Sequence, residues 1–448
     1  MPATGNTATR GKIKVLITAL LLIGLMVGLA ACRGFFGQAP IALFTYTSPT
    51  DTEVPVTITF DISASSDPDG AIVSYDLDYG DTSPHATGTD VTDVLTHTYN
   101  AAGPFTVTLT VTDGDGRIGK ISKTIGNIGP MMITFASDRG GDYDIWRMHA
   151  DGTDEGIVLN TLGDDLFPDL VRGTRDKIAY STEDSVSWNL STMTVLGVGI
   201  ATLTNQTASN QIQPSWSSNQ LKIAYASNAA QTPSDTTWKI YTMVPTGAVD
   251  SGTVLSAITQ TPSWAPAYSP VDANTLLYVS TAGNSGDGTT IWKYNGSTTT
   301  KLIPAADDGK HYGDASPVIS LRTAAPALDL PTNAGISKPA WSLDGTKIAF
   351  STNQGASIDI YVMNANGTAV QTLEAYVNSL LSSPVTTGLI SSPTYDEFSP
   401  YWLEDESGLV FAREEVTGYN IYKVSFDDGS VTQLTDTTGN DIMPAAKR

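Results

Sequence analysis

Residues 338–350 read Lys-Pro-Ala-Trp-Ser-Leu-Asp-Gly-Thr-Lys-Ile-Ala-Phe. The Leu-Asp-Gly-Thr centre is typical of a tight turn between two antiparallel strands. The apolar segments on either side carry the aromatic and β-branched residues that strands favour. The stretch therefore predicts a β-hairpin.

The second half of this hairpin recurs along the chain. A word like Ile-Ala-Phe-Ser stands at six places, at spacings of 45, 45, 53, 72 and 61 residues. The copies begin at Ile133, Ile178, Ile223, Leu276, Ile348 and Leu409. Repetition with such a period is typical of solenoids and propellers, so residues 131–448 are predicted to form a repeat array.

Two further words accompany the copies. A second strand-like word follows each copy, beginning at Asp144, Asn189, Lys239, Thr290, Asp359 and Asn420. A short motif that begins with proline, such as Pro-Ala-Trp-Ser at 339–342, precedes five copies by nine or ten residues; we call it the proline word. It stands at Pro168, Pro214, Pro266, Pro339 and Pro400. Nine residues suit a strand, a tight turn and the returning strand, so each repeat is expected to be a small antiparallel sheet.

The first copy has no proline word before it. The chain instead ends with such a word at Pro444, which lies 44 residues after Pro400. We expect this C-terminal strand to complete the first blade, because propellers close their ring in that way and so remove pairable strand edges. The prediction is six four-stranded blades.

The repeats resemble the TolB-type propeller repeat over the whole array. The resemblance implies a six-bladed β-propeller. The α/β domain that precedes the propeller in TolB is missing, and insertions stand near 305–337 and 374–397, so a role in Tol–Pal transport does not carry over. The residues that carry the resemblance are 136–141, 144–148, 151–153 and 338–350.

Residues 41–128 show a different pattern. Apolar and polar residues alternate at 56–60, 72–75 and 106–111, between turns rich in Gly, Pro and Asp. Period-two alternation predicts half-buried antiparallel strands, and the length suits a small β-sandwich. The whole chain is therefore expected to be all-β.

The words of this segment resemble the PKD domain, an immunoglobulin-like module of surface proteins. The resemblance implies a spacer or an adhesion module. Leu77 departs from it, because the family usually carries Trp there. The words are Phe60-Asp61, Asp67-Pro-Asp-Gly70, Tyr79-Gly-Asp81, His97-Thr-Tyr99 and residues 107–113.

Six carboxylates of the sandwich are candidates for a calcium site, since calcium takes oxygen ligands from adjoining loops. Turn formation is the favoured interpretation, because Asp-Pro-Asp-Gly and Asp-Gly-Asp-Gly form turns whatever they bind and the full EF-hand spacing is absent. No other cofactor is expected. The candidates are Asp67, Asp69, Asp78, Asp81, Asp113 and Asp115.

The N-terminus combines a basic segment, with Arg10, Lys12 and Lys14, and an apolar run over 15–31. Such a combination is typical of a secretory signal. The run ends Leu-Ala-Ala-Cys32, which resembles the bacterial lipoprotein box and implies acylation of Cys32. An uncleaved anchor helix is the alternative, although seventeen residues are few for a membrane span.

We therefore expect a signal peptide over 1–31, a lipid-anchored tether over 32–40, and the rest of the chain outside the cytoplasm. The anchoring membrane is the cell membrane or an outer membrane. The charge of −22, from 24 basic and 46 acidic residues, argues against a nucleic-acid partner. A single Cys excludes a disulfide framework.

The propeller shows no persuasive catalytic pattern. It lacks a Gly-x-Ser-x-Gly elbow and offers only His149 and His311, so we expect no enzyme.

The acids just before the proline words are a candidate binding site, because a partial carboxylate ring at one mouth of the channel would attract cations or a basic partner segment. Capping of each acid's own loop is the alternative. The acids are Asp164, Asp165, Asp396, Glu397 and Asp441.

The sequence predicts a lipid-anchored extracytoplasmic binding or scaffold protein whose propeller contacts an envelope protein. One alternative is a protein that binds surface glycan through exposed aromatic residues. Another is a propeller lyase or glycosidase, which would show paired carboxylates in one pocket. The insertion at 374–397, with Tyr376, Leu380, Leu381, Leu389 and Ile390, is a second candidate contact region. The aromatic residues to examine for glycan binding are Trp188, Trp238, Tyr268 and Trp402.

Overall fold

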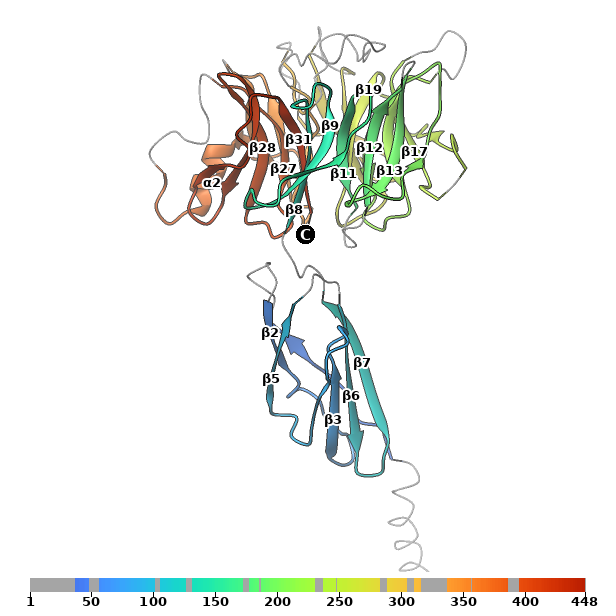
Figure 1. Ribbon diagram of the computed structural model, residues 1–448, viewed down its shortest axis with the longest axis vertical. Helices are drawn as coiled ribbons and strands as arrows, with labels where there is room; N and C mark the ends of the chain where they lie inside the picture. The colour runs from blue at the N-terminus through green and yellow to red at the C-terminus, as the bar shows by residue number, and fades with distance from the viewer. Residues whose placement is uncertain are drawn as a thin grey trace, which may run out of the picture. The chain divides into compact units, whose positions relative to one another are not determined.

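The chain forms two compact units, Met1–Gly129 and Pro130–Arg448, which are described separately. Figure 1 shows their strands in a computed structural model. The structure describes residues 37–47, 56–100, 105–125, 131–171, 177–184, 187–229, 237–246, 248–282, 288–303, 310–315, 337–355, 357–385 and 395–447.

The first unit is a β-sandwich of two antiparallel sheets. One sheet has the order β1-β2-β5 and the other β4-β3-β6-β7. Alternate side chains of the strands at 56–61 and 105–113 are buried between the sheets, as the period-two pattern predicted. Leu77 is fully buried in this core, so it fills the place where the PKD family usually has Trp. The strands are β1 (Thr45–Tyr46), β2 (Val56–Asp61), β3 (Ile72–Asp78), β4 (Ala86–Gly88), β5 (Val94–Tyr99), β6 (Phe105–Asp113) and β7 (Ile118–Ile125).

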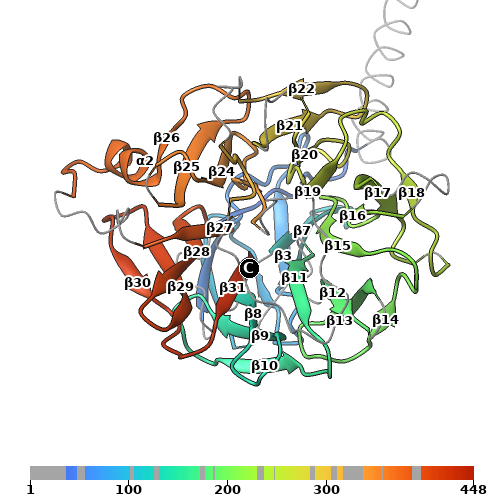
Figure 2. The same cartoon turned by 90° about the horizontal axis from the view of Figure 1, so that it is seen from above.

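The described residues of the second unit form six four-stranded antiparallel sheets, which we number as blades 1 to 6. Figure 2 shows them around a common centre. Blade 1 is β31 (Asp441–Lys447), β8 (Met132–Ser137), β9 (Asp144–His149) and β10 (Gly156–Leu159). Blade 2 is β11 (Asp165–Leu170), β12 (Lys177–Glu183), β13 (Trp188–Thr194) and β14 (Ala201–Thr202), and blade 3 is β15 (Gln211–Trp216), β16 (Ile223–Ser227), β17 (Lys239–Met243) and β18 (Thr253–Val254). Blade 4 is β19 (Ser263–Tyr268), β20 (Leu276–Ser280), β21 (Thr290–Tyr294) and β22 (Thr299–Lys301). Blade 5 is β23 (Ala340–Trp341), β24 (Lys347–Thr352), β25 (Asp359–Asn364) and β26 (Gln371–Thr372), and blade 6 is β27 (Glu397–Trp402), β28 (Gly408–Glu415), β29 (Gly418–Ser425) and β30 (Val431–Gln433).

The C-terminal strand closes the ring, which confirms that prediction. β31 pairs with β8 from Asp441 opposite Ser137 to Lys447 opposite Met132. Figure 2 shows β31, in red, beside β8 near the centre. Blade 1 is therefore built from both ends of the propeller, and its inner edge has a partner along its length.

The proline words form the innermost strand of each blade and give it a bulge. In five blades the pairing register shifts at the proline, because proline has no N–H to donate to the ladder. The residue before each of these prolines has a positive φ of 51–56°. These residues are Phe167, Gln213, Ala265, Ser399 and Met443.

Part of the insertion near 374–397 forms helix α2 (Leu373–Leu380). The Thr372 hydroxyl accepts a hydrogen bond from the Ala375 N–H and caps its first turn. Tyr376 is buried with its ring edge against Trp402, at 5.9 Å between ring centres, so it belongs to the core. Leu380 is half exposed, and Leu389 and Ile390 lie outside the described residues.

Candidate binding site

The six innermost strands surround a central pocket that is open at one mouth. Every blade contributes its proline word or the residues beside it. Aromatic side chains supply much of the wall, so the pocket offers an apolar surface to an occupant. The aromatic lining residues are Phe167, Trp216, Tyr268, Trp341 and Tyr401.

Two charged residues also line this pocket, Lys338 and Asp169. Lys338 Nζ lies 2.7 Å from the carbonyl oxygen of Pro214 and donates a hydrogen bond from blade 5 to blade 3. Asp169 Oδ2 accepts a hydrogen bond of 2.8 Å from the Trp216 N–H. Burial lowers the pKa of Lys338 from its ordinary value of 10.5, and the negative charge of Asp169 opposes that shift.

Hydrogen bonds between neighbouring blades hold the pocket walls. Ser215 Oγ accepts the Tyr268 N–H at 3.0 Å, and the Trp341 indole N–H donates to the Ala267 carbonyl oxygen at 3.0 Å. Such contacts hold the backbones of neighbouring blades together at the pocket.

The candidate carboxylates lie at the beginning of the innermost strands, away from the pocket residues. Asp164 Oδ1 accepts the Tyr143 N–H at 2.9 Å, and Asp396 Oδ1 accepts the Ile358 N–H at 2.8 Å. Each acid thus binds the start of a strand in the preceding blade. Asp165 Oδ2 and Asp441 Oδ2 instead accept hydrogen bonds from Thr161 and Thr437, which lie in the loops just before their own strands.

Two further acids form buried ion pairs. Arg139 Nη2 lies 2.9 Å from both carboxylate oxygens of Asp441, and Arg413 Nη2 lies 2.7 Å from Glu397 Oε1. Arg139 also stacks over the Trp146 ring at 4.2 Å. The chain has few basic residues, and two of its arginines, Arg139 and Arg413, lie where an innermost strand begins.

Asp165 has a different partner at the same strand position. Thr182 pairs with it across the sheet, where Arg413 pairs with Glu397. Burial raises the pKa of Asp165 to about 7, although hydrogen bonds from Thr182 and Thr161 oppose the shift. Burial likewise raises the pKa of Asp144 to about 6.

The prediction of an open carboxylate ring is therefore wrong for most of its members. Asp164, Asp165, Glu397 and Asp441 have no exposed surface, and Asp396 is partly buried. Asp164 and Asp396 join neighbouring blades, whereas Glu397 and Asp441 form ion pairs within their own blades.

The aromatic platform expected for glycan binding is also absent among its four candidates. Trp188, Trp238, Tyr268 and Trp402 are at most 6% exposed, because they pack inside or between blades. Tyr268 alone of the four lines the central pocket.

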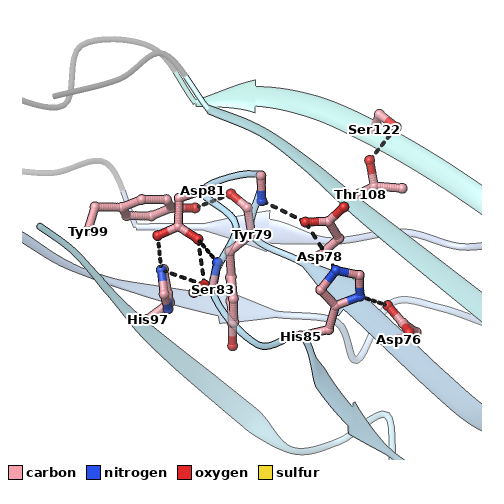
Figure 3. A network of polar contacts seen from close by, with 11 residues as sticks. Asp76, Asp78, Tyr79, Asp81, Ser83, His85, His97, Tyr99, Thr108 and Ser122 are labelled. Carbon is pink, nitrogen blue, oxygen red and sulfur yellow. Dashed lines mark hydrogen bonds and ion pairs between the residues drawn. The ribbon is translucent and has the colours of Figure 1, made fainter. Parts of the chain in front are cut away.

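The candidate calcium ligands lie on three turns of the sandwich. Figure 3 shows Asp81 hydrogen-bonded to Ser83 and to His97 Nε2, the latter at 2.7 Å, while Asp78 accepts the Gly80 N–H at 2.8 Å. The other four also engage nearby groups: Asp67 accepts from Asp69 N–H, Asp69 from Gln38 N–H, and both Asp113 and Asp115 bind Arg117. Within the described ranges, no three His, Cys, Asp or Glu side chains are grouped as a metal site would require.

Exposed apolar side chains gather at one end of the propeller. Because strands alternate in direction, the turn between a blade's first and second strands lies at the same end as the turn between its third and fourth; we call this end the turn face. Of fourteen exposed large apolar residues in the described part of the propeller, nine lie in these turns. They are Leu196, Val198, Ile200, Leu221, Val244, Val249, Val271, Leu343 and Val370.

Sequence reasoning missed both the turn face and the charged pocket. The pocket residues occupy the second halves of the innermost strands, which lead to the turn face. The proline words, which recur at one place in every repeat, were a signal that could have identified the residues lining the pocket.

Cys32 and the signal segment lie outside the described residues, and none of the helices in the described ranges is long and apolar enough to cross a membrane.

Comparison with known families identifies the domain in the first unit. The PKD domain family matches residues 38–126. These residues are a PKD domain. No curated protein sequence gives a significant match to the chain.

Among solved structures, TolB from Acinetobacter baumannii is similar, with 16% identity, a TM-score of 0.50, and 77% of this chain and 80% of that chain covered. The β-propeller domain of the Trilobed protease from Pyrococcus furiosus has 10% identity and a TM-score of 0.38 over 90% and 97% of the two chains. A puromycin-hydrolyzing peptidase from Mycobacterium tuberculosis has 11% identity and a TM-score of 0.41 over 74% of this chain and 49% of that one. The PKD domain is thus followed by a TolB-like β-propeller region.

Proposed function

We propose that this chain is a lipid-anchored extracytoplasmic binding protein, and that its propeller holds another protein of the cell envelope at the turn face. The observation that carries the proposal is the set of exposed apolar side chains in the turns of blades 2 to 5. Large apolar patches on a soluble protein are typical of interaction sites, because water contact with them is unfavourable.

The turn of blade 2 illustrates the chemistry. Leu196 is 68% exposed, and Val198 and Ile200 beside it are more than half exposed. Blade 3 adds Leu221 and blade 4 adds Val271, which are exposed to a similar degree. Binding of a partner that covers these side chains would be favoured by a free energy of about 25 cal/mol for each Å² of apolar surface removed from water.

Neighbouring turns are joined to one another, so the face is a defined surface. The Asp344 N–H donates to Glu406 Oε1 at 2.9 Å, between blades 5 and 6. Lys293 Nζ donates to the Ala365 carbonyl oxygen at 2.8 Å, between blades 4 and 5. Turns held in place lose less conformational entropy on binding than free loops do.

The anchor and the PKD domain complete the proposal. The Leu-Ala-Ala-Cys32 word supports acylation, which would tether the chain to a membrane on the extracytoplasmic side. The PKD domain would act as the spacer between that tether and the propeller.

The test is capture of envelope proteins by residues 33–448. The binding variant is Leu196→Ser with Val198→Ser, and its matched control is Leu162→Ser with Val416→Ser, two exposed apolar residues outside the turns of the turn face. We expect the wild type and the control to capture a protease-sensitive partner, with about tenfold less captured by the binding variant. Capture that survives protease and is competed by envelope glycan would contradict the proposal, as would equal capture by all three chains.

A further inference from the structure

The central pocket contains a cation at a position where the other blades have none. The residues before the six innermost prolines are structurally equivalent, and only Lys338 among them carries a charge. The other five are Phe167, Gln213, Ala265, Ser399 and Met443. The lysine is therefore not a requirement of the repeat.

Among the described residues, the ammonium group of Lys338 has fewer hydrogen-bond acceptors than protons. It has three, and the hydrogen bond to the Pro214 carbonyl oxygen uses one of them. The Lys338 side chain lines the pocket and keeps partial solvent access. An occupant of the pocket can thus accept a hydrogen bond from Nζ.

The partial burial of the Lys338 ammonium group lowers stability unless a ligand compensates for the lost hydration. Burial of an ammonium group is unfavourable, and one neutral carbonyl partner compensates only part of the lost hydration. Asp169 lines the same pocket, but one of its oxygens is engaged by the Trp216 N–H. An anion that enters the pocket would accept a further hydrogen bond from the ammonium group of Lys338.

The walls indicate the rest of such an anion. Trp216, Tyr268, Trp341 and Tyr401 surround the space with aromatic surface, and Met443 adds a flexible apolar side chain. Inorganic anions are strongly hydrated and would leave this surface uncovered. An organic anion would bury its apolar part there while its charged group meets the lysine.

We propose that the central pocket binds a small organic carboxylate with an apolar body, and that the carboxylate accepts a hydrogen bond from Lys338 Nζ. This site is separate from protein binding at the turn face. The aromatic walls contribute affinity, and Lys338 selects the charged end.

The test uses tryptophan fluorescence of residues 33–448, because Trp216 and Trp341 line the pocket. The probes are 3-phenylpropionate, 4-phenylbutyrate and octanoate, with 3-phenylpropanol as the neutral analogue. The variant is Lys338→Met, and the matched control is Lys222→Met, which removes the same charge from an exposed lysine.

We expect at least one carboxylate to give saturable binding to the wild type and to Lys222→Met, with affinity about tenfold or more lower for Lys338→Met. The wild type should also bind 3-phenylpropanol about tenfold or more weakly than 3-phenylpropionate, and this comparison needs no variant to fold. Absence of saturable binding by all three carboxylates would overturn the proposal. So would equal affinity of Lys338→Met and the wild type, or of the acid and the alcohol. A loss of partner capture by the turn-face variant leaves these results unchanged, so the two proposals fail separately.

Discussion

At the scale of single residues, the propeller places charge inside its blades and apolar groups on its turns. The acids before the innermost strands are buried, while Leu196 and Val271 are about two-thirds exposed. This arrangement reverses the usual preference of both residue types. The acids are stabilised by backbone N–H groups and by arginine, and the apolar tips are available to a partner.

Asp165 provides a prediction with a defined pH dependence. Its folded pKa of about 7 lies above its ordinary value of 3.8, so the folded state binds the extra proton between these values and stability falls as pH rises through that window. Asp165→Asn removes this penalty. We expect it to raise the free energy of unfolding by about 2–4 kcal/mol at about pH 8 and to change it little at about pH 4.

Chemical denaturation of the two chains at both pH values measures this effect. The exposed Asp427→Asn is the matched control, since it makes the same chemical change at a solvated site. A gain of equal size at both pH values would show that ionisation of Asp165 is not its cause.

At the scale of elements, β31 is held on β8 by the ladder and by one buried ion pair. Arg139 and Asp441 stand 302 residues apart in the chain, and their contact joins the C-terminal strand to the first blade. Arg139 also lies 2.7 Å from Glu155 Oε1, so loss of the Asp441 carboxylate removes one of its two ion-pair partners. We expect Asp441→Asn to lower the free energy of unfolding by about 1.5–3 kcal/mol, the usual contribution of hydrogen bonds to a charged group.

Amide hydrogen exchange tests whether this pair closes the ring. Glu397→Gln is the matched variant, because Glu397 and Arg413 form the same kind of pair within blade 6, where chain continuity holds the strands. The Asp441 variant should speed exchange in β31 and β8 first. Faster exchange spread evenly over all blades, or confined to blade 6, would disagree with a closing role.

The sequence predicted the strands well and the site poorly, for a physical reason. Residues 133–137 and 178–181 are recognisable as buried strands from local composition alone, and the recurrence of Pro168 and its equivalents located the innermost strands. Burial of Asp441 depends on an arginine at the other end of the array, which no local pattern reveals. The apolar residues at 196–200 have strand-like composition, and only the turn that holds them makes them exposed.

At the scale of the whole molecule, the proposal assigns a separate task to each part of the chain. Cys32 is the proposed anchor, the PKD domain at residues 38–126 is the proposed spacer, and the closed propeller carries the turn face. A ring of six sheets keeps that face fixed, because every blade packs against two neighbours. The central claim is that this face contacts another protein.

The most direct measurement is site-specific photo-crosslinking in the cell that makes this protein. A photoreactive residue would replace Leu196 in one chain and Val416 in another, since both are well exposed and only Leu196 lies on the turn face. We predict a discrete crosslinked protein adduct at Leu196 and none at Val416. The same adduct at both positions, or no adduct at Leu196 while the chain is folded and present at its membrane, would contradict the claim.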